Sequence, residues 1–101
     1  MPRQCADASF DYRLFETEQF LKSLDRLQKS DAAFIYAKLT EYAYPQLRKE
    51  PRVGINIKKL RGYEPETWRY RIGRFRVFYT IEQNERIIKM VSVDFRKDAY
   101  R

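Results

Sequence analysis

Apolar and polar side chains alternate through the last third of the chain, which is the pattern of consecutive β-strands. In Trp68–Ile72 the apolar side chains share one face, whereas Arg69 and Arg71 lie on the other. The same alternation recurs in Phe75–Ile81. Ile87–Val93 is a nearly continuous apolar run, which is typical of a central strand covered on both faces. We therefore predict three consecutive antiparallel strands.

Helical spacing dominates the first half of the chain. Phe10–Phe15 alternates and predicts a short strand, and Thr17 is a suitable N-cap for a helix after it. Apolar residues then recur every three or four positions in Phe20–Leu27 and again in Phe34–Ala43. Pro45 disfavours the helical conformation at Tyr44, the residue before it, and should end the second helix. The two helices should form a hairpin that buries both apolar stripes, Phe34 included, against the sheet.

The segment between the helices and the strands is predicted to be irregular. Leu47–Glu66 is interrupted by prolines and glycines, and its basic residues surround Leu60. It is either a solvated loop held by Leu60 or a basic loop beside the arginines. We expect residues 1–9 to be a loose tail and residues 10–101 to be one α+β domain. Its fold is an antiparallel twisted sheet of about four strands with an N-terminal helix hairpin packed on one face. The sequence leaves open whether the first strand pairs parallel to one of the last three, at the centre or at the edge.

Charge and composition narrow the chemistry. The chain has 101 residues, with 21 Lys and Arg against 14 Asp and Glu, and a net charge of +7. This balance indicates a polyanionic or acidic partner, unless it only aids solubility. A single cysteine, Cys5, and the lack of histidine exclude a disulfide framework, a histidine-based triad and the usual zinc sites. We expect no metal and no cofactor. No apolar run is long enough for a membrane helix, and Met1–Ser9 lacks a signal core, so we expect a cytoplasmic protein.

Basic side chains form the candidate binding site. The residues expected on or beside the polar sheet face are Arg69, Arg71, Arg74, Arg76, Arg96, Lys58, Lys59 and Arg61. A guanidinium group matches two phosphate oxygens at once, so several on one rigid sheet form a phosphate site. The alternative is a solvated face whose arginines pair with Glu82 or Glu85.

Aromatic side chains and RNA's own reactivity suggest what such a site could do. Tyr63, Trp68, Phe78 and Tyr100 are candidates for stacking on bases, although the spacing of most aromatics indicates a core. The 2′-hydroxyl of RNA can attack its adjacent phosphate without a metal if the phosphate is aligned and protons are transferred. Arginines supply alignment and charge. Tyr100 could transfer protons, because surrounding positive charges favour its ionised form. Lys58 or Lys59 could also do so if like charges crowd them.

Three motifs resemble the RelE/ParE superfamily of bacterial and archaeal toxins. They are KKLRG at Lys58–Gly62, WRYRIGRFRVFYTI at Trp68–Ile81 and VSVDFRKDAY at Val91–Tyr100. The resemblance covers nearly the whole chain from Phe10 and implies a RelE-like fold. It implies a type II toxin whose partners are an acidic antitoxin, the ribosome and messenger RNA. The RelE-like branch contains ribosome-dependent messenger-RNA endonucleases, which inhibit translation.

The resemblance also assigns roles to individual residues. It implies that Arg69 and Arg71 hold the places of phosphate-contacting lysines, that Arg76 stabilises the scissile phosphate, that Arg96 matches the arginine after the last strand and that Tyr100 stacks on a base or assists proton transfer. With the basic residues identified above, we predict catalytic roles for Arg71, Arg76, Arg96 and Tyr100. We predict contacts to RNA or phosphate for Arg69, Lys58, Lys59, Arg61 and Arg74. Two departures leave the proton acceptor unidentified. Phe95 stands where many relatives have histidine, and Gly54–Lys59 lacks a carboxylate. The alternatives are a ParE-like inhibitor of DNA gyrase and a basic binding module without catalytic activity.

Overall fold

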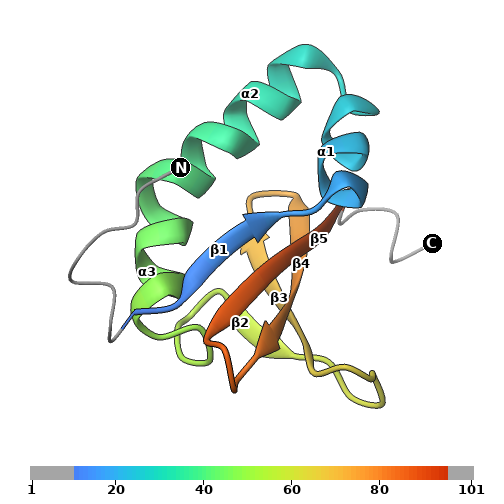
Figure 1. The fold of residues 1–101 in the computed structure, drawn as a ribbon. Coiled ribbons are helices and arrows are strands. Elements are labelled where there is room, and N and C mark those ends of the chain that lie inside the picture. Colours follow the sequence, from blue (N-terminus) through green and yellow to red (C-terminus); the bar gives the residue numbers. More distant parts are fainter. Residues whose placement is uncertain (1–10, 96–101) are drawn as a thin grey trace.

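A five-stranded sheet carries the helices on one face (Figure 1). The structure is a computed structural model, and it describes residues 11–95. Its elements in chain order are β1 (Arg13–Glu16), α1 (Glu18–Asp25), α2 (Lys29–Lys38), η2 (Leu39–Ala43), α3 (Tyr44–Lys49), β2 (Ile57–Lys59), β3 (Thr67–Ile72), β4 (Phe75–Glu82) and β5 (Ile87–Phe95). The predicted α+β class is confirmed. The fifth strand is β2, which is too short to stand out within the segment that we predicted to be irregular.

The strand order is β1-β5-β4-β3-β2, and the sheet is mixed. β1 runs parallel to β5 at one edge, whereas the other neighbours are antiparallel. The three consecutive antiparallel strands predicted from the sequence are confirmed, and the first strand, whose partner the sequence left open, pairs parallel to β5 at the edge. Thr17 joins the parallel pair to the helices, because its hydroxyl donates to the Met90 carbonyl at 2.6 Å and accepts from the Phe20 amide at 3.1 Å. The N-cap predicted at Thr17 is confirmed.

A β-bulge explains the apolar run of β5. Phe78 pairs with Ser92 but the next residue, Tyr79, pairs with Met90, so Val91 is an extra residue. The extra residue shifts the alternation of side chains along the strand. Lys89 is exposed on the face away from the helices, so the prediction that this strand is covered on both faces is wrong. The core side of β5 consists of Ile88, Met90 and Val93.

The second helix does not end at Pro45. A π-helical turn, η2, follows α2, and the Tyr44 amide donates to the Leu39 carbonyl five residues earlier. Pro45 then lies in the first turn of α3, where a missing amide hydrogen costs nothing in hydrogen bonds. This turn carries the helix on to Lys49, so our prediction of its end was wrong.

The core lies between the helices and one face of the sheet. Its fully buried side chains are Phe20, Ile35, Leu39, Ala43, Leu47, Val77, Tyr79, Ile88 and Met90. The alternation in β3 and β4 buries the apolar side chains that the sequence predicts to be internal. Phe34 is an exception, because it is 45% exposed. Ile35 and Leu39 face the sheet, so their neighbour Phe34 points outward and its predicted place in the core is wrong. Within residues 11–95 no helix is long and apolar enough to cross a membrane.

Candidate functional site

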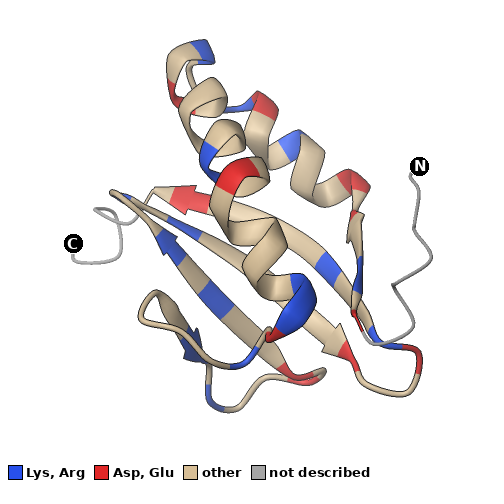
Figure 2. Cartoon of the chain, turned by 90° about the vertical axis from the view of Figure 1, so that its left-hand side faces the viewer, with Lys and Arg blue, Asp and Glu red and all other residues tan. Residues whose placement is uncertain are grey.

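Strand register brings four basic residues together on the sheet face opposite the helices. Arg71 of β3 pairs with Arg76 of β4, and Lys58 of β2 pairs with Arg69 of β3. Residues directly opposite each other on neighbouring strands point to the same side, with Cβ atoms roughly 4.5–5.5 Å apart. We call Lys58, Arg69, Arg71 and Arg76 the arginine face. Figure 2 shows basic positions on neighbouring strands of the sheet.

Arg71 and Arg76 form no ion pair with the acidic side chains among the described residues. Within residues 11–95 the ion pairs join Lys22 to Glu18 at 3.8 Å and Arg52 to Glu66 at 3.0 Å. Pairing of these two arginines with Glu82 or Glu85 is therefore not observed. The Nε atom of Arg76 is buried and has no hydrogen-bond partner among the described residues. The arginine face therefore offers guanidinium donors to a ligand.

A carboxylate also lies beside the arginine face. Asp94 of β5 pairs with Arg76 and is exposed. Asp94 is not among the predicted site residues, because the bulge at Val91 hides the register of β5. The alternation of Ser92 and Asp94 with Val93 was the available signal. Asp94 is a possible proton acceptor in a chain that lacks histidine.

The other predicted site residues lie away from the arginine face or outside residues 11–95. Lys59 pairs with Trp68, so it is exposed on the opposite side of the sheet edge from Lys58. Arg61 lies in the turn after β2, and Arg74 lies in the turn between β3 and β4. Arg96 and Tyr100 lie outside the described residues, so their roles stay predictions.

Trp68 is buried and belongs to a network that holds the start of β3. Its indole N–H donates to Glu66 at 2.7 Å, and Glu66 also accepts from Arg52 at 3.0 Å and 3.4 Å. The hydrogen bond from Arg52 is the largest cause that lowers the pKa of Glu66, and Trp68 lowers it further. Arg52 in turn donates to the Tyr12 hydroxyl at 3.3 Å. The network ties the loop after α3 to the sheet, and it accounts for Trp68 as a core residue.

Three tyrosines on the helix side are unsuited to proton transfer. The hydroxyls of Tyr36 and Tyr44 both donate to Glu16, at 2.7 Å and 2.8 Å. Burial, together with this hydrogen bond to a carboxylate, raises the pKa of Tyr36 to about 12, and the same causes raise the pKa of Tyr44. Burial also raises the pKa of Tyr79. These groups stay protonated near neutral pH.

A groove lies between α2 and the end of β3, and we call it the helix groove. Its volume is about 320 Å³, and it is lined by Phe34, Lys38, Tyr42, Asn56, Tyr70, Arg71, Ile72 and Gly73. Phe34 is 45% exposed and Tyr42 is 58% exposed. The Lys38 ammonium lies 5.8 Å from the Phe34 ring centre and 5.2 Å from that of Tyr42. α2 therefore carries apolar residues on both of its faces, although the sheet covers one of them.

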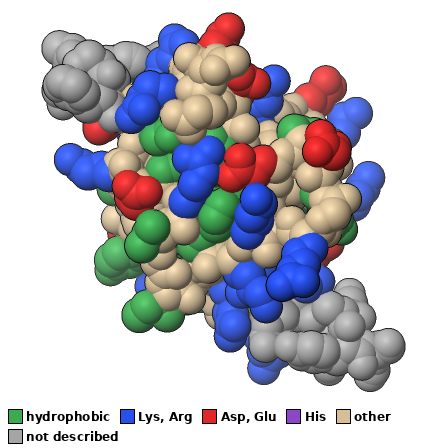
Figure 3. Space-filling model, turned by 90° about the horizontal axis from the view of Figure 1, so that it is seen from below, with side chains coloured by type: hydrophobic (Ala, Val, Ile, Leu, Met, Phe, Trp, Pro, Cys, Tyr) green, Lys and Arg blue, Asp and Glu red, His purple; other side chains and the backbone are tan. Residues whose placement is uncertain are grey.

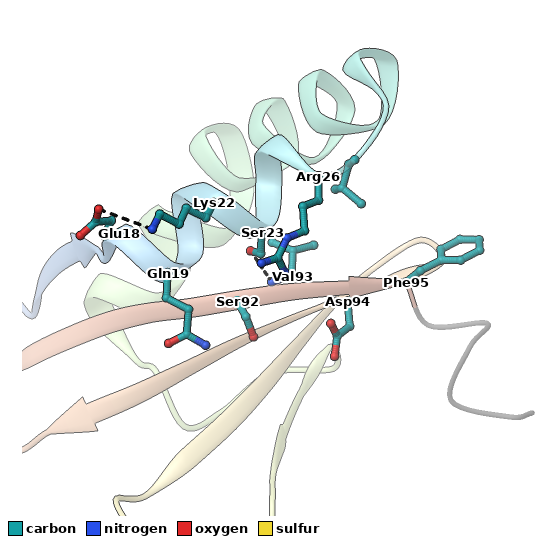
Figure 4. A pocket seen from close by; sticks show the side chains of 10 residues that line it. Glu18, Gln19, Lys22, Ser23, Arg26, Ser92, Val93, Asp94 and Phe95 are labelled. Atoms are coloured by element: carbon teal, nitrogen blue, oxygen red, sulfur yellow. Dashed lines mark hydrogen bonds and ion pairs between the residues drawn. The ribbon is translucent and has the colours of Figure 1, made fainter.

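A second hollow, of about 720 Å³, lies between α1 and β5 (Figure 4). Its polar side chains are Glu18, Gln19, Lys22, Ser23, Arg26, Ser92 and Asp94. Both signs of charge are present, so this hollow lacks the uniform positive charge that suits a phosphate. Another side of the molecule carries both basic and apolar side chains (Figure 3). On the side seen in Figure 3, Lys and Arg gather over one part of the surface and apolar side chains lie exposed over another.

Comparisons with known proteins agree with this architecture. Residues 14–100 match the family model for the ParE toxin of the type II toxin–antitoxin system parDE. A protein of Methanocaldococcus jannaschii named as toxin RelE1 is 39% identical over 51 residues, which span 50% of this chain and 56% of the relative. The chain thus matches little more than half of that relative's length.

Solved structures share the fold. A chain of the toxin–antitoxin complex RelBE2 from Mycobacterium tuberculosis superposes with a TM-score of 0.63 at 25% identity, covering 85% of this chain and 99% of the other. The YoeB/ParE toxin from Agrobacterium tumefaciens gives a TM-score of 0.66 at 18% identity, and the match covers 82% of this chain and 96% of the other. The second likeness concerns the fold alone. The family match, which spans most of the sequence, establishes the relationship: the chain belongs to the ParE toxin family of type II toxin–antitoxin systems, within the RelE/ParE superfamily.

Proposed function

We propose that this toxin cleaves messenger RNA on the ribosome and so stops translation in the cytoplasm. The observation that carries the proposal is the arginine face, where Arg71 and Arg76 lie side by side on a rigid sheet without an ion-paired acid among residues 11–95. Donors held in place before the substrate arrives stabilise the charge that develops on a phosphate in the transition state. An RNA backbone is the substrate that such a surface fits.

The reaction is the attack of a 2′-oxygen on the adjacent phosphorus. The bond from phosphorus to the 5′-oxygen of the next nucleotide breaks, which leaves a 2′,3′-cyclic phosphate and a 5′-hydroxyl. Arg71 and Arg76 hold the phosphate and stabilise its added charge. Asp94 accepts the 2′-hydroxyl proton, and Tyr100 or Lys58 donates a proton to the leaving oxygen. Arg69 contacts a neighbouring phosphate.

The test is primer extension on messenger RNA from translating ribosomes incubated with the purified toxin. Wild type should produce discrete cuts, and Arg76→Ala should slow them roughly 100- to 1000-fold, the usual cost of removing a donor to a developing charge. Arg48→Ala removes the same charge from an exposed site on α3 and should cut normally. Uncut RNA with wild-type toxin, or equal cutting by Arg76→Ala, would refute the proposal.

Inhibition of DNA gyrase is the second candidate function, and the ParE description of the matching family favours it. In this case the arginine face would contact an acidic or DNA-bound surface of the enzyme, and no RNA would be cut. Purified gyrase with plasmid DNA distinguishes the two functions. Accumulation of gyrase-linked broken DNA, together with intact ribosomal messenger RNA, would establish the second candidate.

We also propose that an acidic antitoxin binds the toxin at the helix groove. The relatives from M. tuberculosis and Pyrococcus horikoshii were solved as complexes with RelB-type antitoxins. In this chain the groove combines exposed aromatic rings with Lys38 and Arg71, and no acid lines it. A segment with apolar side chains beside carboxylates is complementary to it.

Calorimetric titration with the antitoxin tests this site. Phe34→Ala should weaken the complex roughly 10-fold or more, because aromatic anchors dominate such interfaces. Leu21→Ala is the matched control, since Leu21 is 44% exposed on α1 outside the groove. Equal affinities of the two variants would rule out the helix groove as the docking site.

A further inference from the structure

An apolar trough lies directly beside the arginine face. Strands β3, β4 and β5 form its floor, with Phe78 of β4 and Val91, the bulged residue of β5, and the loop between β2 and β3 supplies the rest. Its volume is about 520 Å³, and its lining consists of Leu60, Tyr63, Pro65, Thr67, Phe78, Thr80, Val91, Ser92 and Asp94. Neither Lys nor Arg lines it. The trough is therefore unsuited to a second phosphate and suited to an uncharged flat group.

The trough and the arginine face are close enough to contact one nucleotide. Arg69 pairs across the strands with Phe78, and the Arg76 guanidinium lies 5.5 Å from the Phe78 ring centre. A ring beside cations is the arrangement that proteins use for single-stranded nucleic acids, in which the backbone follows the charge and bases stack on aromatic faces. Tyr63 adds a second aromatic ring on the loop, where it is 59% exposed.

We propose that this trough binds a base of the RNA strand whose phosphate lies on the arginine face. The base stacks on Phe78 and is covered by Tyr63, and Asp94 accepts a hydrogen bond from an exocyclic amino group. Asp94 lies beside both the phosphate site and the trough, so it acts on the base at the trough end and on the 2′-hydroxyl at the arginine end. The proposal rests on RNA being the ligand, and it adds a contact that reads the base.

The burial of Phe78 and Tyr63 decides which substitution tests the trough most directly. Phe78 is half-buried in the sheet, so its replacement affects both folding and binding, whereas Tyr63 is exposed on a loop. Tyr63→Ala therefore tests the trough without loss of core packing. Leu21→Ala, exposed on α1, controls for the removal of an apolar side chain elsewhere.

The experiment measures binding of the full-length toxin to fluorescent 2′-O-methyl RNA hexamers, which resist cleavage, by anisotropy at fixed salt. One abasic nucleotide is moved through the hexamer. For wild type, one position should weaken binding roughly 5- to 100-fold, the usual worth of a stacked base. Tyr63→Ala and Phe78→Ala should bind the intact hexamer more weakly and respond much less to that abasic position. Leu21→Ala should behave as wild type.

The outcomes separate the trough from the proposed function. Binding that depends on Arg76 but is insensitive to every abasic position would overturn the base site and leave the phosphate site standing. If Tyr63→Ala weakens antitoxin binding and leaves RNA binding unchanged, the trough accepts a protein side chain and the proposal is wrong. If wild type binds none of the hexamers, the base site fails, whereas the proposed function is decided by primer extension on translating ribosomes.

Discussion

The carboxylate of Glu66 gives the sharpest test of how the site is supported. It accepts hydrogen bonds from Arg52 at 3.0 Å and 3.4 Å and from Trp68 at 2.7 Å, so Glu66→Gln removes the charge and keeps the shape. Hydrogen bonds to a charged group are each worth about 1.5–3 kcal/mol when buried. The side chains of Arg52 and Glu66 are each 30% exposed, which screens part of this energy. We expect the substitution to lower the free energy of unfolding by about 1–2 kcal/mol at pH 7.

The stabilisation by Glu66 depends on pH in a predictable direction. The pKa of Glu66 is lower in the folded protein than in the unfolded chain, where it is about 4.3. The stabilisation is therefore complete above that value and is lost as the pH falls through the folded pKa. Urea unfolding followed by circular dichroism should show a difference between wild type and Glu66→Gln at pH 7 that shrinks in acid.

The matched control is Glu85→Gln, which removes an exposed carboxylate from the turn between β4 and β5. It should change the stability by less than about 0.5 kcal/mol at pH 7. A Glu66→Gln difference that is absent at pH 7, or that stays constant in acid, would show that the network does not hold β3 as described.

Three further predictions concern the core and the arginine face. Ser23→Ala should lower stability in urea by about 1–3 kcal/mol, because it leaves the buried Val93 amide without the hydroxyl that it contacts at 3.0 Å; no loss would mean that another group satisfies this amide. Leu39→Ala, at a fully buried position, should cost about 2–5 kcal/mol in the same assay, and a cost below about 1 kcal/mol would contradict close packing there. The plot of log affinity for single-stranded RNA against log salt should lose about 0.7 in slope in Arg76→Ala. Arg48→Ala should keep the wild-type slope, and an unchanged slope in Arg76→Ala would place the phosphate elsewhere.

Local patterns were sufficient to predict the sheet that carries the site. The alternation in β3 and β4 identified which side chains are buried and placed Arg69, Arg71 and Arg76 on the opposite face. The cap at Thr17 was equally local, because a hydroxyl three residues from an amide needs no tertiary information. These features depend on neighbours in the sequence, and for that reason they were predictable.

The features that depend on distant residues were missed. The bulge at Val91 becomes visible only when β5 is paired with β4, so neither the exposure of Lys89 nor the position of Asp94 could be derived. The π-turn before Pro45 resolves a conflict between a helix that continues and a proline that interrupts it. Phe34 has the spacing of a core residue, but the sheet covers the face of α2 that carries Ile35. In each case tertiary packing overrides the local preference.

Arg71 connects the two proposed binding surfaces. Its cross-strand partner is Arg76 on the arginine face, and it also lines the helix groove beside Asn56, whose carbonyl accepts its amide at 3.0 Å. A carboxylate of the antitoxin in the groove and a phosphate on the sheet would therefore compete for one guanidinium group. Binding coupling is reciprocal, so saturating 2′-O-methyl RNA should weaken antitoxin binding by the factor by which antitoxin weakens RNA binding. Calorimetric titrations in both orders measure this factor. Arg71→Ala should bring it close to one, whereas Arg48→Ala should leave it unchanged, and an unaltered factor in Arg71→Ala would show that the two surfaces are separate.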